Sequence, residues 1–244
     1  MLVGDLFSGI GGFSLGLQRA GMQTAFFCEQ DKFCKKVLKK HWPEVPIYSD
    51  VRYLHYGGSV DVICGGFPCQ PYSITGEQRG EADDRDLWPE MFRIVRKHRP
   101  RWVIGENVPG FINLGLDKAL SNLESEGYTT ATFIVPACAV NAPHRRDRLW
   151  IVANAHGHRL QGRAFKGQNA WQQLEKQLAG LPKPDVWGER PNYLPKPVLC
   201  RGDDGLSRRV DRLKALGNAI VPHIAEIFGK MIMLTEGKAY GVAR

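Results

Sequence analysis

The residue of this sequence that is best suited to chemistry is a cysteine held between two prolines. Cys69 lies in GGFPCQPYS (residues 65–73), directly after an apolar run, with Pro68 and Pro71 beside it. A thiol in such a turn can act as a nucleophile when a basic neighbour or a helix N-terminus lowers its pKa. The alternative, an inert packed cysteine, better suits the cysteines that lie within or beside apolar runs. These are Cys28, Cys34, Cys64 and Cys138.

An acid and two arginines are the next candidates. Glu106 ends the apolar run RWVIGE (101–106), where a partly dry carboxyl group can have a raised pKa and donate a proton. In APHRRDRLW (142–150), strand alternation places Arg146 and Arg148 on one face and Arg145 on the other. Paired guanidinium groups can hold a phosphate or a base carbonyl. A surface glutamate and a solvated basic turn are the alternative interpretations.

A glycine-rich turn indicates a ligand site. DLFSGIGGFSLGL (5–17) changes from an apolar run to a helical pattern through three glycines, which let a ligand approach the backbone. Glu29 comes 20 residues after Gly9 and ends the next apolar run, where a carboxylate can accept both hydroxyls of a ribose. With Glu29 and Asp50 each at or near a strand end, a nucleoside-containing cofactor is favoured over a purely structural turn. The sequence has no GK[ST] phosphate loop, which disfavours ATP.

These residues must be positioned by alternating strands and helices. Several runs are apolar throughout, as in strands that are covered on both faces, and the alternation predicts a parallel, doubly wound α/β sheet. The predicted strands are 2–7, 24–29, 60–66, 101–106, 130–135 and 148–153, and the predicted helices are 12–20, 31–41, 87–98 and 116–126. From Asn154 to Gly205 the pattern fails, with only a short helix expected near 168–179. An amphipathic helix begins at about Pro222.

Composition limits the class of protein. The 244 residues include 33 basic and 25 acidic side chains, a net charge of +8 at pH 7. Residues 141–216 hold 15 of the basic and 7 of the acidic ones, which leaves 18 of each elsewhere, so the excess is local and indicates a polyanion partner. Six cysteines without a CxxC pair favour neither a disulfide framework nor a zinc site. Without a secretory signal or a long apolar run, we expect an intracellular protein and no membrane span.

Taken in order, these stretches resemble the cytosine-C5 DNA methyltransferase family of bacteria and phages. DLFSGIGGFSLGL resembles the cofactor loop, GGFPCQPYS the Pro-Cys loop, ENV the acidic motif, RRDR the arginine motif, and GNAIVP (217–222) the C-terminal motif. The resemblance implies a doubly wound, mostly parallel sheet of the SAM-dependent methyltransferase (Rossmann-like) type, with a small irregular target-recognition lobe. Its parts would be a catalytic domain at 1–153, a recognition region at 154–206, and a returning C-terminal motif and helix at 207–244.

The resemblance also implies a covalent mechanism. The Cys69 thiolate would add to C6 of a cytosine flipped out of the duplex, while Glu106 protonates or hydrogen-bonds N3. C5 would then take the methyl group of S-adenosyl-L-methionine, leaving S-adenosyl-L-homocysteine, and loss of the C5 proton would expel the cysteine. Arg148 would contact O2 of the base, and Arg146 would support the loop and backbone.

The remaining site residues follow from matched positions. Phe7 would stack on the adenine, Glu29 would bind the ribose and Asp50 the adenine amino group. The rest of the cofactor site would be Gly9, Ile10, Gly11, Gly12, Leu87 and Asn218. The substrate-binding residues would be Pro68, Gln70, Ser73, Asn107 and His144. His144 stands where many members carry glutamine, and Gln30 where an aromatic residue is common; residues 74–86 resemble the mobile loop of the family.

The expected partner is double-stranded DNA, bound by a monomer without a metal ion, in the cytoplasm of a prokaryote or from a phage gene. Restriction-modification is one role that fits this family. Two alternatives are an RNA cytosine-C5 methyltransferase and an inactive homologue that only binds DNA. The Pro-Cys-Gln sequence favours DNA over RNA, and retention of Cys69, Glu106, Arg146 and Arg148 argues against loss of activity.

Overall fold

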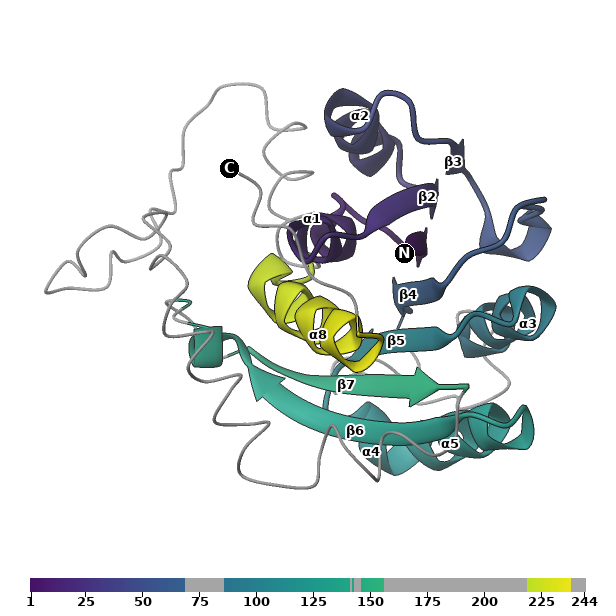
Figure 1. Cartoon of the computed structure of the whole chain (residues 1–244), viewed down its shortest axis with the longest axis vertical. Coiled ribbons are helices and arrows are strands. Elements are labelled where there is room, and N and C mark those ends of the chain that lie inside the picture. The colour runs from purple at the N-terminus through teal and green to yellow at the C-terminus, as the bar shows by residue number, and fades with distance from the viewer. Residues whose placement is uncertain (69–85, 141, 143–145, 156–218, 238–244) are drawn as a thin grey trace, which may run out of the picture.

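The computed structural model describes residues 1–68, 86–140, 142, 146–155 and 219–237 (Figure 1). The strands are β1 (Leu2–Leu6), β2 (Gln23–Cys28), β3 (Ile47–Tyr48), β4 (Val62–Gly66), β5 (Trp102–Asn107), β6 (Thr129–Pro136) and β7 (Asp147–Asn154). The α-helices are α1 (Gly12–Arg19), α2 (Lys32–His41), α3 (Trp88–His98), α4 (Phe111–Leu114), α5 (Leu116–Ser125) and α8 (Pro222–Thr235). Two short 3-10 helices, η1 (Val51–Tyr53) and η4 (Ala137–Val140), complete the described elements.

The strands form one seven-stranded sheet in the order β3-β2-β1-β4-β5-β7-β6. The pairs among β1 to β5 are parallel, whereas β7 runs antiparallel to both of its neighbours, β5 and β6. The predicted doubly wound, mostly parallel sheet is therefore confirmed, with a single reversed strand. All six predicted strands are present; the two-residue β3 and the four-residue α4 were not predicted.

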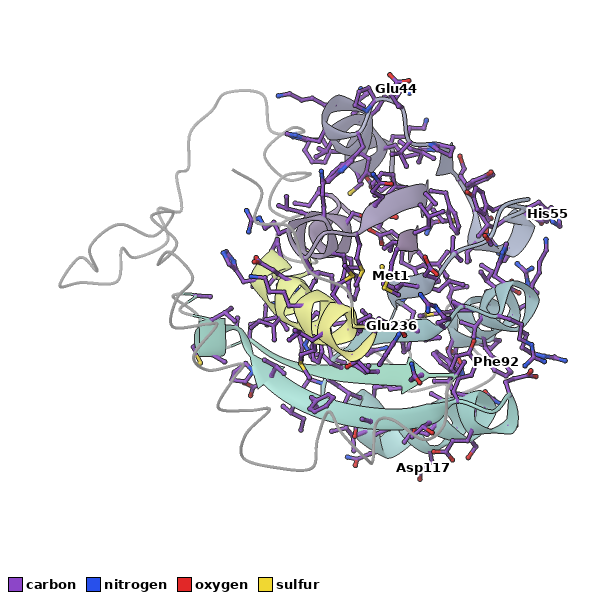
Figure 2. The ribbon with its side chains drawn as sticks, in the orientation of Figure 1. Met1, Glu44, His55, Phe92, Asp117 and Glu236 are labelled. Atoms are coloured by element: carbon purple, nitrogen blue, oxygen red, sulfur yellow. The ribbon has the colours of Figure 1, made fainter. Side chains whose placement is uncertain are left out.

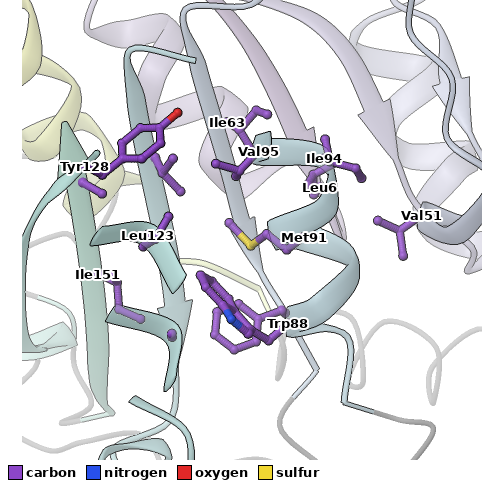
Figure 3. Close-up of a cluster of buried hydrophobic side chains, with 14 of the residues drawn as sticks. Leu6, Val51, Ile63, Trp88, Met91, Ile94, Val95, Leu123, Tyr128 and Ile151 are labelled. Carbon is purple, nitrogen blue, oxygen red and sulfur yellow. The ribbon is translucent and has the colours of Figure 1, made fainter. Parts of the chain in front are cut away.

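Both faces of the sheet are covered, which explains the unbroken apolar runs. Alternate residues of β4 point to opposite layers: Ile63 packs in the cluster formed with α3 and α5, while Val62 and Cys64 pack in the cluster formed with α1 and α8. Figure 3 shows the first layer, with Met91 of α3 and Leu123 of α5 beside the strands. Each central strand thus contributes to two cores, and its carboxyl end is held rigidly.

Capping and proline residues mark where several helices begin. The Asp31 side chain caps α2 by accepting hydrogen bonds from the backbone N–H groups of Phe33 and Cys34, at 2.8 and 2.9 Å. Proline lies in the first turn of both α3 and α8, where its missing N–H has no helical acceptor to satisfy. Trp88 of α3 packs against Phe67, which follows β4, and Ile220, shortly before α8, lies beside Gly66 at the end of β4. The first turns of both helices thus border the site described below.

The C-terminal helix α8 lies beside α1 (Figure 1). At its far end Glu236, labelled in Figure 2, accepts a hydrogen bond from Trp102 Nε1 at 2.9 Å and pairs with Arg101 at the start of β5. Helix α8 is thus fixed to the sheet at one end, and its first residues are held at the opposite, carboxyl edge. Among the described helices, none has the length and apolar character that crossing a membrane requires. The predicted helix near 168–179 and residues 156–206 of the predicted recognition region lie outside the described residues, and Asn154 is the last residue of β7.

Candidate active site

The glycine-rich turn joins β1 to α1 in a left-handed backbone conformation. Gly9 and Gly11 have φ angles of +54° and +87°, values that favour glycine, and Phe7 also has a positive φ of 53°. The Trp42 ring lies against Gly11, because a methyl group placed there would be 2.6 Å from Trp42 Cζ3. A methyl group on Gly9 would meet nothing within 4 Å. The turn is therefore supported from behind and open at Gly9.

Two carboxylates border this turn. Glu29, which follows β2, accepts hydrogen bonds from the backbone N–H groups of Gly9 and Asp31, each at 2.7 Å. Asp50, which follows β3, binds the Arg52 guanidinium through both oxygens, and these hydrogen bonds lower the pKa of Asp50. Glu29 is thus fixed by two backbone N–H groups and Asp50 by the Arg52 guanidinium, each just after a strand. The sequence predicted each of them at or near a strand end, and the structure brings Glu29 into direct contact with the turn.

The other predicted cofactor residues that the structure describes are buried or half-buried. Phe7 is half-buried and packs on the core layer that contains Leu6, while Ile10 is half-buried within the turn itself. Gly12 is buried beneath Ile220. Leu87 is half-buried immediately before α3 and packs on the same core layer as Phe7.

A second group of residues lies at the ends of β4 and β5. Gly66 is paired with Glu106, so the strand that leads to Pro68 ends directly beside the buried carboxyl group. Phe67 is buried, with its ring centroid 5.3 Å from that of Trp88. Asn107 is also buried; its Nδ2 donates to the Phe67 carbonyl at 3.4 Å, and its Oδ1 accepts from the next backbone N–H. The Asn107 side chain thus joins the end of β5 to the start of the Pro-Cys loop.

Glu106 has the most unusual electrostatic environment at this edge. Its Oε1 lies 2.9 Å from Arg148 Nε on β7. Burial raises the pKa of Glu106 from its ordinary value to about 7, although the charges of Arg148 and Arg146 act in the opposite direction. At neutral pH the carboxyl group therefore exists in both protonation states, which is what a proton donor needs.

Arg146 connects this group to the C-terminal segment. Its Nη2 donates to the Ala219 carbonyl at 3.1 Å, and its backbone has a positive φ of 35°. Burial and the nearby Arg148 charge lower the pKa of Arg146. Strand alternation predicted only that both arginines share one face; in the structure Arg146 directly precedes β7, and the charges of both arginines act on Glu106. The sequence did not reveal the link to Ala219, because the partner is a backbone carbonyl 73 residues away.

Several predicted site residues lie outside the described part of the chain. These are Cys69, Gln70, Ser73, His144 and Asn218, together with residues 74–85 of the predicted mobile loop. Within the described residues, no group of three His, Cys, Asp or Glu side chains is arranged to hold a metal ion.

The sequence interpretation missed a buried polar chain behind the glycine turn. Asp5 of β1 is fully buried and accepts a 2.6 Å hydrogen bond from Ser14 Oγ of α1, which in turn accepts one from Thr24 Oγ1. Burial raises the pKa of Asp5 to about 7. The available signal was the aspartate inside the apolar run LVGDLF, since a buried carboxyl group requires a partner.

Sequence comparison with known proteins identifies similarity to cytosine-specific DNA methyltransferases. A sequence profile of the family described as C-5 cytosine-specific DNA methylase matches residues 1–191. The type II methyltransferase M2.BsuMI of Bacillus subtilis is 39% identical over 163 residues, 63% of this chain and 42% of the relative. The type II methyltransferase M.HhaI of Haemophilus parahaemolyticus is 30% identical over 66% of this chain and 51% of the relative. The chain thus spans about two fifths to one half of the length of these relatives.

Solved structures with a similar fold are also methyltransferases. A DNA modification methyltransferase encoded within an E. coli prophage superposes with a TM-score of 0.54 at 29% identity, covering 63% of this chain and 46% of its own. The S. pombe Dnmt2 methyltransferase, at 18% identity, shares the fold with a TM-score of 0.56 over 75% of this chain and 57% of its own. With the profile match covering most of the sequence, the chain belongs to the C-5 cytosine-specific DNA methylase family.

Proposed function

We propose that this protein is a DNA (cytosine-5-)-methyltransferase that uses S-adenosyl-L-methionine. The observation that carries the proposal is the pairing of the buried Glu106 with Arg148 at 2.9 Å, beside the strand end that leads into Pro68 and Cys69. An acid with a pKa of about 7 next to a fixed guanidinium suits a heteroaromatic base whose ring must accept electrons.

In this proposal the base is activated by addition and then restored by elimination. The Cys69 thiolate forms a bond to C6 of cytosine, and protonated Glu106 donates to N3, where electron density accumulates. Arg148 donates to O2, and Arg146 holds the segment at Ala219 in place. After C5 has gained a methyl group, a base takes the C5 proton and N3 returns its proton to Glu106. The C5–C6 double bond re-forms as the Cys69 thiolate leaves. The target base must leave the duplex, which costs a few kcal/mol.

The glycine turn fits the cofactor. The space at Gly9 is open, and the Glu29 carboxylate lies at the adjoining strand end, where the two ribose hydroxyls would be bound. Phe7 offers a half-buried ring for the adenine, and Asp50 offers an oxygen for the adenine amino group. S-adenosyl-L-methionine supplies the electrophilic methyl group when bound. The chain contributes the turn that admits it and the carboxylates that orient it.

Other assignments rest on the family resemblance and remain part of the proposal. Substrate contacts are assigned to Pro68, Gln70, Ser73 and His144, and closure of the pocket to Asn218. Asn107 is assigned to holding the Pro-Cys loop, because its side chain is buried and bonded to backbone groups. Residues 154–206 are assigned to target recognition. The protein is proposed to act as a monomer on double-stranded DNA in a prokaryotic cytoplasm.

Trapping of a covalent adduct tests the proposal. Duplex DNA containing 5-fluorocytosine should form a denaturation-resistant complex with the wild-type protein in the presence of S-adenosylmethionine, because fluorine at C5 cannot leave as a proton. Cys69→Ser should form none while still binding DNA. Methyl transfer to DNA and to transfer RNA is measured in parallel. Transfer to RNA alone would favour the RNA enzyme, and DNA binding without any adduct would favour an inactive homologue.

A further inference from the structure

Ile220 lies between the two halves of the candidate active site. It directly precedes the last residue before α8, and its side chain is half-buried at the carboxyl edge of the sheet. The Arg146 hydrogen bond to the Ala219 carbonyl fixes the backbone immediately before it. Ile220 is therefore held in place at the site without being buried in the core.

On one side Ile220 contacts the start of α1. A methyl group placed on Gly12 would lie 2.5 Å from the Ile220 carbonyl oxygen and 3.0 Å from its Cβ. Any side chain larger than hydrogen at position 12 would displace this segment. The backbone of Ile220 is thus seated directly on the end of the glycine turn that is proposed to hold the methyl donor.

On the other side Ile220 reaches the proposed base site. A methyl group placed on Gly66 would lie 3.2 Å from Ile220 Cδ1 and 3.1 Å from Glu106 Oε2, so these two atoms flank the same point. The isoleucine backbone therefore touches the donor side, while the tip of its side chain stands beside the acid proposed to bind cytosine.

We propose that Ile220 is a positioning residue that sets the separation and alignment of the methyl donor and the target base. This inference rests on the proposed function. Methyl transfer requires the reacting atoms to approach to about 3–3.5 Å in line, and a displacement of about 1 Å can cost 100-fold in rate. Formation of the base adduct does not require the donor. Shortening Ile220 therefore impairs methyl transfer more than adduct formation.

The two steps can be separated by the fate of the hydrogen at C5. In the adduct, C5 can take a proton from water and then lose its original hydrogen isotope, after which the thiolate departs and the base is restored without methylation. With the donor aligned, C5 takes the methyl group and loses the isotope once. Tritium released per methyl group transferred is therefore a measure of donor alignment, and a uniform loss of folded enzyme does not change it.

The experiment uses the full-length protein, donor labelled with ¹⁴C in the methyl group, and bacterial chromosomal DNA that carries tritium at cytosine C5 and lacks cytosine methylation. The wild-type ratio should be about one, because each transfer expels one C5 hydrogen. Ile220→Ala should lower methyl transfer about tenfold while tritium release changes far less, so that the ratio rises several-fold. Ile220→Val, which keeps most of the side chain, should lie between the two.

Ile227→Ala is the matched control, since it shortens a half-buried isoleucine on α8 itself. Its ratio should stay at the wild-type value. An unchanged ratio in Ile220→Ala, or an equal rise in Ile227→Ala, would overturn the inference but not the proposed function. A wild-type protein that neither releases tritium nor transfers methyl groups would overturn both.

Discussion

Glu106 Oε1 accepts a hydrogen bond from Arg148 Nε at 2.9 Å, yet the pKa of Glu106 is raised. An adjacent guanidinium alone would lower the pKa of a carboxyl group. Here burial is the larger effect, since Glu106 is only 8% exposed at the end of a strand covered on both faces. The pair therefore holds an acid in a fixed orientation and still leaves it protonated for part of the time at neutral pH.

The pH dependence of methyl transfer should reflect this acid. With a pKa of about 7, Glu106 loses its proton as the pH rises through neutrality, so the rate of the chemical step should fall on the alkaline side. Glu106→Gln, which cannot deliver a proton, should be slower by about 100-fold and should lack this alkaline fall. Single-turnover rates between pH 6 and 9 test both statements. An alkaline fall that persists in Glu106→Gln would assign it to another group.

Removing the Arg148 charge should move that profile in a defined direction. Because the positive charge of Arg148 lowers the pKa of Glu106, Arg148→Gln should raise it further and shift the alkaline fall to higher pH. The maximal rate should also decrease, since the proposed contact with O2 of cytosine is lost. Arg96→Gln is the control, because Arg96 pairs with Glu126 on the exposed side of α3. A fall at lower pH in Arg148→Gln would contradict the electrostatic explanation.

Two alanine substitutions can distinguish filling of the open space beside Gly9 from the backbone strain of a positive φ angle. Gly9 and Gly127 have φ angles of +54° and +84°, and a methyl group on either would meet nothing within 4 Å. Gly9→Ala and Gly127→Ala should therefore each cost about 1 kcal/mol of stability. Only Gly9→Ala should weaken binding of S-adenosylhomocysteine, by about tenfold or more, because its methyl group would enter the proposed ligand space. Calorimetric titration and urea unfolding measure the two quantities, and equal affinity in both variants would contradict the placement of the cofactor.

The central sheet could be predicted because its physical signal is strong. Strands covered on both faces are predominantly apolar, and several of the predicted strands were recognised in this way. The direction of β7 could not be predicted, because an apolar run has the same appearance in either orientation. Ile47–Tyr48 was missed since two residues after a proline form too short a pattern for a strand.

The candidate site was predictable where strand ends determine it. Glu106 was expected at the end of a strand, and Arg146 and Arg148 were expected on one face. The ion pair between Glu106 and Arg148 emerged only from the structure.

The role of Ile220 was not visible, because it depends on contacts with Gly12 and Gly66, which lie far away in the sequence. The aspartate in LVGDLF signalled a buried polar group but did not identify Ser14 as its partner. Periodicity reports which face a residue occupies, but it does not report which distant segment covers that face.

Asp5 provides a test of the buried polar chain through the pH dependence of stability. In the folded protein burial raises the pKa of Asp5 from its ordinary value of 3.8 to about 7. The folded state thus retains a proton that the unfolded chain has released. This contribution to stability is fully present below pH 4 and is lost as the pH rises through 7. Asp5→Asn, which does not titrate, should remove that dependence.

The quantity to compare is the free energy of unfolding in urea at pH 5 and pH 8. Between these values the wild type should lose about 2 kcal/mol more than Asp5→Asn, because other titrating groups contribute equally to both proteins. Asp117→Asn, at an exposed position of α5, should behave like the wild type. Asn can still accept the Ser14 hydrogen bond, so folding should be retained. Identical pH dependence in wild type and Asp5→Asn would show that the Asp5 carboxyl group does not hold a proton at neutral pH.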